Sequence, residues 1–264
     1  QVKYPAKWGV QIVGMIFQTR SNTITGKDTN HMSQSSFGNK FKVTTWGESH
    51  GKALGAVIDG CPAGLPLCEE DIQKFLDRRK PGQSRYTTAR KEGDLVEILS
   101  GVFEGKTTGT PISLMLRNTD QRSRDYGNIA YSYRPGHADY TFDQKYGFRD
   151  YRGGGRSSGR ETIGRVAAGA IASKILEELG ISICTYTRSI GPVEIASFNK
   201  EEIHQNAFYM PDAQAAVKAG EYLEECMKNQ DSAGGVIECR ITGTPAGLGE
   251  PVFDKLSALL APVS

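Results

Sequence analysis

Two histidines on glycine-bearing turns are the side chains of this sequence best suited to proton transfer. His50 stands in Gly47-Glu48-Ser49-His50-Gly51, and His137 stands in Arg134-Pro135-Gly136-His137-Ala138-Asp139. Imidazole exchanges a proton near neutral pH, so each side chain is a candidate general acid or base. Taken alone, each turn is explained about as well by an ordinary hydrogen-bonded histidine. Asp139, two residues after His137, is a weakly supported candidate to orient that ring.

A glycine triplet that leads into basic and hydroxyl-bearing residues predicts an anion site. Residues 153–162 read Gly-Gly-Gly-Arg-Ser-Ser-Gly-Arg-Glu-Thr. The glycines let the backbone approach a ligand closely, and Ser158 and Glu161 have the spacing of a capping box. Backbone amides at a helix start, with Arg156 and Arg160 beside them, suit phosphate and carboxylate groups. The alternative is a tight loop before an ordinary capped helix.

A basic tract provides further candidate anion ligands. It reads Arg78-Arg79-Lys80-Pro81-Gly82-Gln83-Ser84-Arg85-Tyr86 and is extended by Arg90 and Lys91. Arginine forks bind phosphate and carboxylate in a bidentate manner, which favours a small polyanionic ligand. A solvated helix end and a nucleic-acid surface are the alternatives. The latter ranks lower because the tract has few aromatic residues and the net charge of the chain is only +2.

Composition and cysteine spacing limit the class of protein. The chain has 264 residues, of which 38% are hydrophobic and 23% charged, as in ordinary globular proteins. Its five cysteines form no Cys-x-x-Cys pair, which argues against a disulfide framework or a metal site. No apolar run reaches the roughly 20 residues of a membrane helix. We therefore expect a cytoplasmic protein without a metal ion that binds neither membranes nor nucleic acid.

Hydrophobic periodicity predicts a mixed protein in which strands 41–45 and 53–59 flank the His50 turn. Further strands are expected at 95–100, 112–116 and 237–241, and helices at 68–80, 158–179 and 212–228. The dense polar segment from Asn118 to Tyr126 is interpreted as a solvated connection, with a binding loop as the alternative. Residues 1–31 share none of these patterns and lead to Met32. They are expected to be a mobile or non-native extension of one domain spanning residues 32–264.

The motifs above, in this order and with these intervals, resemble the chorismate synthase family. The resemblance runs from about Phe37 to the end of the chain, and its motifs are Gly47–Gly51, Ala56–Pro62, Asp77–Gly82, Asn118–Gln121, Arg134–Asp139 and Gly154–Thr162. It implies an α+β fold with helices sandwiched between antiparallel sheets, assembled as a homotetramer. The chain resembles the N-terminal two thirds of the family. We therefore expect this chain to expose unpaired strand edges and apolar faces.

The resemblance also implies a reaction and roles for individual residues. The family is a carbon–oxygen lyase that removes phosphate from 5-enolpyruvylshikimate-3-phosphate by 1,4-anti elimination, which gives chorismate and requires reduced FMN. His50 falls on the acid that assists phosphate departure, and His137 on the histidine that protonates or steadies the flavin. Substrate-contacting positions are Ser49, Arg79, Arg85, Arg134, Ser158, Gly159 and Arg160. Arg156, Ser157 and Ser158 fall on an FMN-contacting stretch, and Arg79 and Arg85 on positions assigned to NADP.

The chain shows no inserted reductase segment, so an external flavin reductase is the expected source of reduced FMN, with NADPH as the indirect electron donor. Two other classes remain open at this point. One is a non-catalytic phosphate- or nucleotide-binding module. The other is an RNA- or DNA-binding protein that uses the Arg78–Lys91 tract. The affinity of such a protein for nucleic acid would fall steeply as the salt concentration rises.

Overall fold

The computed structural model describes residues 35–79, 93–118, 131–152 and 154–260. Its larger sheet has the strand order β1-β2-β3-β7-β4, and all of its pairings are antiparallel. The strands are β1 (Ser36–Phe37), β2 (Lys42–Gly47), β3 (Ala53–Asp59), β4 (Val96–Ser100) and β7 (Ile112–Arg117). The strands predicted at 41–45, 53–59, 95–100 and 112–116 are thereby confirmed, and the His50 turn joins β2 to β3.

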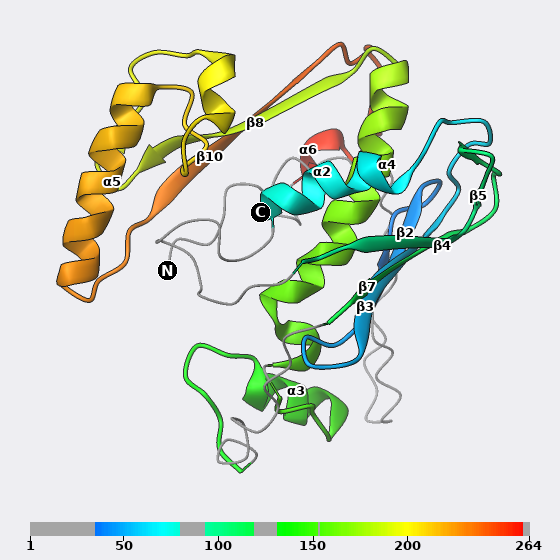
Figure 1. Ribbon diagram of the computed structural model, residues 1–264, viewed down its shortest axis with the longest axis horizontal. Helices are drawn as coiled ribbons and strands as arrows, with labels where there is room; N and C mark the ends of the chain where they lie inside the picture. The colour runs from blue at the N-terminus through cyan, green and yellow to red at the C-terminus, as the bar shows by residue number, and fades with distance from the viewer. Residues whose placement is uncertain (1–34, 80–92, 119–130, 153, 261–264) are drawn as a thin grey trace.

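Two helices cover one face of this sheet and form the middle layer of the molecule (Figure 1). They are α2 (Glu69–Arg79) and α4 (Thr162–Glu178), which pack against each other. The first three turns of α4 carry mainly alanine and glycine and are almost entirely buried. A Cβ at Gly164 would lie 2.9 Å from both Gly55 O and Thr45 Cγ2. Small residues therefore allow α4 to lie directly on β2 and β3, where the large hydrophobic core forms.

A second sheet lies on the other side of the helical layer. It has the order β10-β8-β9, from β8 (Ser182–Ile190), β9 (Val193–Glu194) and β10 (Gly235–Thr242). Helix α5 (Ala213–Lys228), predicted at 212–228, packs near its far end around a small core of its own, and Asp212 caps its start. The outer edge of β10 pairs with no strand in the described part of the chain. The α+β fold, with helices between antiparallel sheets, is confirmed.

The remaining elements are short and connect these layers. They are β5 (Val102–Phe103), β6 (Lys106–Thr107), α3 (Asp139–Tyr146), the 3-10 turns η3 (Gly155–Ser157), η4 (Gly159–Glu161) and η5 (Lys200–His204), and α6 (Leu256–Leu260). Periodicity predicted none of them, because each is too short to show a repeat. Within the ranges given above, no helix combines the length and apolarity that crossing a bilayer requires.

The predicted helix start at Ser158 is wrong, and so is its capping box. Helix α4 begins at Thr162, after η3 and η4, and Ser158 caps only the short η4 turn by accepting a 3.4 Å hydrogen bond from Arg160 N. The Glu161 carboxylate accepts a 2.8 Å hydrogen bond from Thr45 Oγ1 and pairs with Arg165 at 2.8 Å. These partners from β2 and from the next helical turn take the place of the backbone amide that a capping box would supply.

Candidate functional site

The turn that carries His50 is buried and fixed from two sides. Ser49 is fully buried and His50 is 6% exposed, and Ser49 Oγ lies 3.1 Å from His50 Nδ1. The Ser49 amide donates to Gly155 O at 3.4 Å, which joins the turn to the glycine-rich segment. Asn118 Nδ2 donates to Glu48 O at 3.2 Å and to Gly51 O at 2.8 Å. The histidine is therefore part of a rigid, inward-facing turn rather than of an ordinary surface turn.

A buried carboxylate holds two of the predicted ligand-binding arginines. Asp94 Oδ2 lies 2.7 Å from Arg79 Nη1, and Asp94 Oδ1 lies 3.1 Å from Arg160 Nη2. Arg160 Nη2 also donates to Asn118 Oδ1 at 2.9 Å. A continuous chain of polar contacts thus runs from Arg79 through Asp94, Arg160 and Asn118 to the turn of His50. Arginines from α2 and from η4, 81 positions apart, are brought together by residues of the β-sheet layer.

Asp94 owes its position to α2 and to an unusual backbone conformation. Its φ of 46° lies in the left-handed region, which a non-glycine residue seldom adopts and which recurs at functional sites. Gln73 on α2 donates to Asp94 O at 3.2 Å and accepts from Val96 N at 3.1 Å. Helix α2 therefore fixes the backbone that aims this carboxylate at the two arginines.

Arg156 is directed into the fold in this structure. Its Nη1 donates to Gly47 O at 3.1 Å, and its Nη2 donates to Thr45 O at 3.2 Å and to Thr45 Oγ1 at 2.7 Å. These bonds clamp η3 to the end of β2. Ser157 next to it is exposed, with its hydroxyl donating to Gly154 O at 2.7 Å, and Gly159 is also exposed. The described part of the glycine-rich segment thus has one anchoring arginine and two accessible positions.

Arg134 and Asp139 form a bidentate pair, which excludes the predicted pairing of Asp139 with His137. Arg134 Nε and Nη2 each donate to the carboxylate at 2.8 Å, and Arg134 N donates to it at 3.1 Å. The hydrogen bonds from Arg134 hold the pKa of Asp139 at about 2. His137 is exposed, and its Nδ1 lies 3.2 Å from Pro135 O. A charged guanidinium is the stronger partner for a carboxylate, so Asp139 orients Arg134 instead.

Arg134 lies next to the glycine-rich segment. Its Nη2 is 3.7 Å from the point that a Cβ at Gly154 would occupy. On the other side of the segment, Asp150 lies near Gly155, and the positive charge of His50 acts on its carboxyl group. Burial acts to raise the pKa of Asp150, but hydrogen bonds from Arg152, with the charge of His50, lower it below its usual value. Asp150 therefore pairs with Arg152 and lies close enough to His50 for the two side chains to interact electrostatically.

The structure thus brings together most of the residues that the sequence singles out. The connected set comprises Ser49, His50, Arg79, Arg134, Arg156, Ser158 and Arg160. His137 is exposed near the start of α3, and Arg85 and Gly153 lie outside the described residues. The interpretation of Asn118 as part of a solvated connection is wrong, because this residue is buried and links two loops.

Asp94 is the site residue that sequence reasoning missed, whereas Asn118 was named in a family motif but interpreted as part of a solvated connection. Asp94 stands alone in Gly93-Asp94-Leu95 before a predicted strand, and Asn118 follows another one. A polar residue directly at a strand end was the available signal, but it does not reveal which arginine the residue contacts.

The donors present match the chemistry of a phosphate-bearing cofactor and substrate. Phosphate oxygens are bound by groups of the kinds present here: guanidinium groups, the hydroxyls of Ser49, Ser157 and Ser158, and the exposed backbone at Gly159. Phosphate and carboxylate groups of a ligand, including the phosphate of a cofactor such as FMN, would therefore find suitable donors at this site.

Two antiparallel sheets around a helical layer, with arginines held beside a buried serine–histidine turn, define an α+β protein with a site for anionic ligands. A model of the family described as chorismate synthase matches residues 41–263, and a model of a family of unknown function matches residues 1–30. The chain belongs to the chorismate synthase family, as the sequence motifs predict. The match to the chorismate synthase model begins at Phe41, so residues 1–31 lie outside it.

Individual relatives agree with this assignment. The chain is 70% identical over 232 residues to chorismate synthase from Agathobacter rectalis, covering 87% of this chain and 63% of that protein. It is 68% identical over 232 residues to the protein of that name from Lachnoclostridium phytofermentans, with the same coverage. A crystal structure of chorismate synthase superimposes with a TM-score of 0.64 at 35% identity, covering 80% of this chain and 61% of that chain. The chain thus spans about 63% of the length of these curated relatives.

Proposed function

We propose that the protein containing this chain is a chorismate synthase that eliminates phosphate from 5-enolpyruvylshikimate-3-phosphate and requires reduced FMN. The observation that supports this most strongly is the polar chain from Arg79 through Asp94, Arg160 and Asn118 to the buried turn of His50. This chain of contacts links two arginines to the turn of a histidine, which supports a site that binds an anion and transfers a proton to it. Because the chain covers 63% of its relatives, this activity is proposed for the whole protein.

The substrate carries one phosphate and two carboxylates, and the site supplies cations for such a ligand. We assign substrate binding to Ser49, Arg79, Arg85, Arg134, Ser158, Gly159 and Arg160. Asp94 and Asp139 hold three of these arginines in fixed orientations. Guanidinium groups that are already oriented lose less conformational freedom when a ligand binds, which raises affinity.

His50 acts as the general acid in this proposal. As the carbon–oxygen bond breaks, phosphate departs with the electron pair, and a proton from the His50 imidazolium offsets its growing charge. A proton leaves the substrate carbon skeleton for solvent in the same overall elimination, solvent returns a proton to His50, and the new double bond forms without net oxidation. Asp150 would stabilise the charged imidazolium, since its carboxylate acts electrostatically on His50.

Arg156, Ser157 and Ser158 would hold FMN, and His137 would donate a hydrogen bond or a proton to it. When bound, reduced FMN supplies the electron-rich partner that this redox-neutral elimination requires. In this structure, Arg156 fastens the segment to β2, so it would hold FMN by positioning the segment, while Ser157 and Ser158 would make the direct contacts. Arg79 and Arg85 are also candidates for the anionic groups of NADPH, the indirect electron source.

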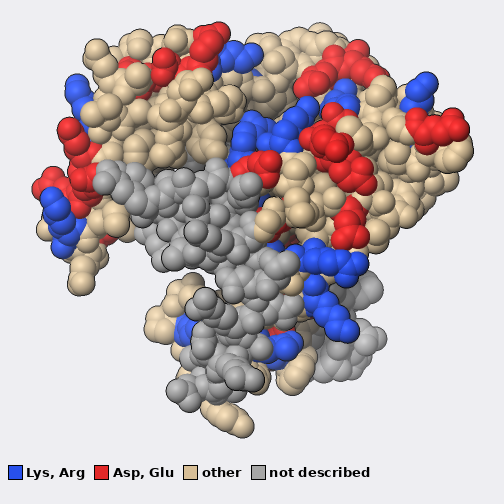
Figure 2. Space-filling view, in the orientation of Figure 1, with Lys and Arg blue, Asp and Glu red and all other residues tan. Residues whose placement is uncertain are grey.

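Further parts of the proposal concern the whole protein. It is a cytoplasmic homotetramer supplied with reduced FMN by an external reductase, and residues 1–31 form an extension of the enzyme domain. On the face shown in Figure 2, acidic and basic side chains of the described residues are interspersed. That distribution favours a small-molecule ligand over polynucleotide, which binds to broad basic surfaces.

The decisive experiment is an anaerobic assay of chorismate formation and phosphate release. The enzyme would consist of residues 32–264 followed by the C-terminal segment of the A. rectalis relative. His50→Ala and His137→Ala are each expected to lower turnover by about 10²–10⁴ while ligand binding persists. His137→Ala should also change the spectrum of bound reduced FMN, whereas His50→Ala should mainly slow phosphate release.

The same assay separates the alternatives. A binding module would take up FMN but release no phosphate from the substrate. A polynucleotide-binding protein would lose affinity steeply with salt and would not respond to FMN. Parent-rate turnover in both histidine variants would remove these residues from the mechanism, and absence of chorismate from the parent enzyme would refute the proposed function.

A further inference from the structure

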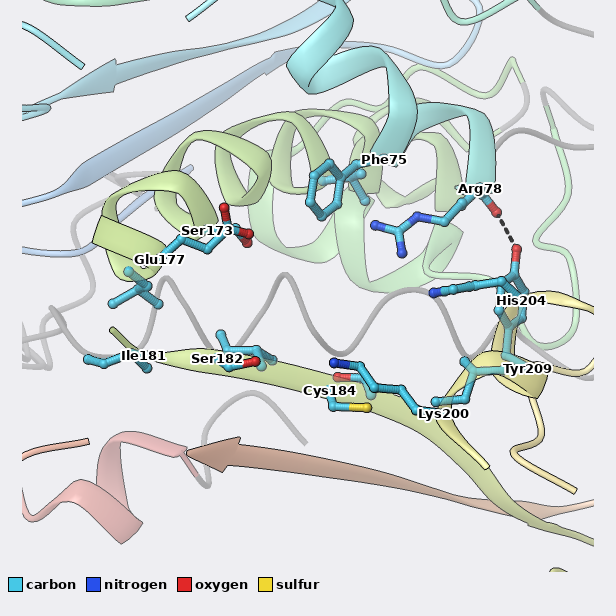
Figure 3. A pocket seen from close by; sticks show the side chains of 15 residues that line it. Phe75, Arg78, Ser173, Glu177, Ile181, Ser182, Cys184, Lys200, His204 and Tyr209 are labelled. Carbon is cyan, nitrogen blue, oxygen red and sulfur yellow. Dashed lines mark hydrogen bonds between the residues drawn. The ribbon is translucent and has the colours of Figure 1, made fainter. Parts of the chain in front are cut away.

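A cavity separate from the site described above lies between the helical layer and the second sheet (Figure 3). Its volume is about 300 Å³, at the lower end of the range for small-molecule sites. Its apolar wall comes from α2, α4 and the start of β8 and includes Phe75, Val166, Leu176, Ile181 and Ile183. The contacts that join His50 to Arg79 include none of these residues.

Basic side chains gather at one end of the cavity. Arg78, Lys200 and His204 line that end, while Ser173 and Glu177 lie at the opposite end. Within the described ranges, no carboxylate lies within ion-pair distance of Arg78 or Lys200. The Arg78 guanidinium instead stacks 4.5 Å above the ring of Phe75, and burial lowers its pKa. A partly desolvated cation without a carboxylate partner gains free energy from any anion that reaches it.

The basic end is held in place by a strained residue. Tyr209 has a φ of 55°, and its hydroxyl donates to Arg78 O at 3.2 Å. Its ring meets that of His204 edge-on, with centroids 6.0 Å apart, and its carbonyl accepts from Thr187 N at 2.9 Å. A left-handed conformation at an aromatic residue is costly and is retained where surrounding contacts impose it, often at functional sites. Tyr209 thus ties the end of α2 to η5 and β8 across the cavity.

We propose that this cavity binds a small organic anion, a carboxylate or phosphate monoester on an apolar body, with the charged group at Arg78, Lys200 and His204. The apolar body would lie against Phe75, Leu176 and Ile183. An uncharged ligand of the same shape would leave the basic end without its counter-charge. This site is distinct from the proposed catalytic site and does not depend on the proposed function.

Calorimetric titration of this chain tests the proposal, with 3-phenylpropanoate, phenyl phosphate and the uncharged 3-phenylpropanamide as probes. At least one anion should bind about tenfold or more tightly than the amide, because a charge-assisted contact is lost in the latter. The relative affinities of the two anions identify the preferred charged group. Similar affinities for both anions and the amide would overturn the proposal, as would no binding of either anion at about 10 mM.

Variants locate the binding. Lys200→Gln alters an exposed residue, and Arg78→Met keeps an apolar stem against Phe75, so each should fold while weakening the anion about tenfold. Lys218→Gln, on the exposed face of α5, is the matched control and should change nothing. Arg134→Gln removes a cation of the proposed catalytic site. If Arg134→Gln abolished binding while Lys200→Gln and Arg78→Met left it intact, the anion would occupy the other site and the proposal would fail.

Discussion

Replacing Asp94 by asparagine should destabilise the protein far more than the loss of an ordinary ion pair. The carboxylate is fully buried and lies 2.7 Å from Arg79 and 3.1 Å from Arg160, whose side chains are 10% and 6% exposed. Removing one partner of a buried pair leaves a desolvated charge and costs about 3–5 kcal/mol. Asparagine keeps the size of the side chain and tolerates the left-handed backbone at φ 46°, so the substitution isolates the charge.

Urea unfolding at pH 7, followed by circular dichroism, measures this cost as a change in the free energy of unfolding. The matched control is Glu97→Gln, which removes a 3.0 Å pair with Arg117 whose partners are 45% and 67% exposed. Exposed pairs contribute about 0.2–1 kcal/mol, so the control should be nearly neutral. An Asp94→Asn loss no greater than that of Glu97→Gln would refute the view that Asp94 holds the arginine cluster together.

Three further predictions concern the framework of the site. Asn118→Ala should cost about 1–3 kcal/mol of unfolding free energy in urea, because two turn carbonyls and an arginine lose a buried partner; a loss below about 0.5 kcal/mol would contradict this. Gly164→Ala should lower the melting temperature, because its Cβ would lie 2.9 Å from atoms of β2 and β3; Gly234→Ala, with open space around it, is the control, and equal melting temperatures would be the contrary result. Hydrogen bonds from backbone amides of the first turn of α5 hold the pKa of Asp212 at about 2 in the folded protein. The Asp212 carboxylate therefore stabilises the fold above about pH 4, the pKa of aspartate in the unfolded chain, and this stabilisation is lost as the pH falls toward 2. Asp212→Asn should therefore lose less stability than the parent between pH 5 and about pH 2.5 in urea titrations, and parallel losses would show that this carboxylate does not contribute.

The strands and helices that could be predicted from the sequence are those whose hydrophobic residues repeat regularly and whose ends are marked by a capping or turn residue. Helix α5 has an apolar face and an aspartate cap, and Gly180 ends α4 with a φ of 73°. The start of α4 was misplaced because Ser158 and Glu161 match a local capping pattern, whereas the actual partners of Glu161 include Thr45 in a distant strand. A contact over 116 positions leaves no trace in local spacing.

The candidate site was predictable as a set of residue types but not as an arrangement. Serine, histidine and arginine on glycine-bearing turns indicate anion chemistry because few other side chains bind phosphate or transfer protons at neutral pH. Which carboxylate holds which arginine depends on tertiary packing. Asp139 therefore paired with Arg134 instead of His137, and Asp94 was not identified at all.

The consecutive residues Arg78 and Arg79 show how helix geometry divides one basic tract between two places. Successive side chains on an α-helix diverge by about 100°, so neighbours cannot face the same site. Arg79 accordingly turns to Asp94 and Thr162, while Arg78 stacks on Phe75 beside the cavity between the helical layer and the second sheet. The sequence interpretation treated the tract as a single cluster around one ligand. Its first two residues, however, lie in the last turn of α2, where one supplies a cation to the proposed catalytic site and the other supplies a cation to a different side of the helix.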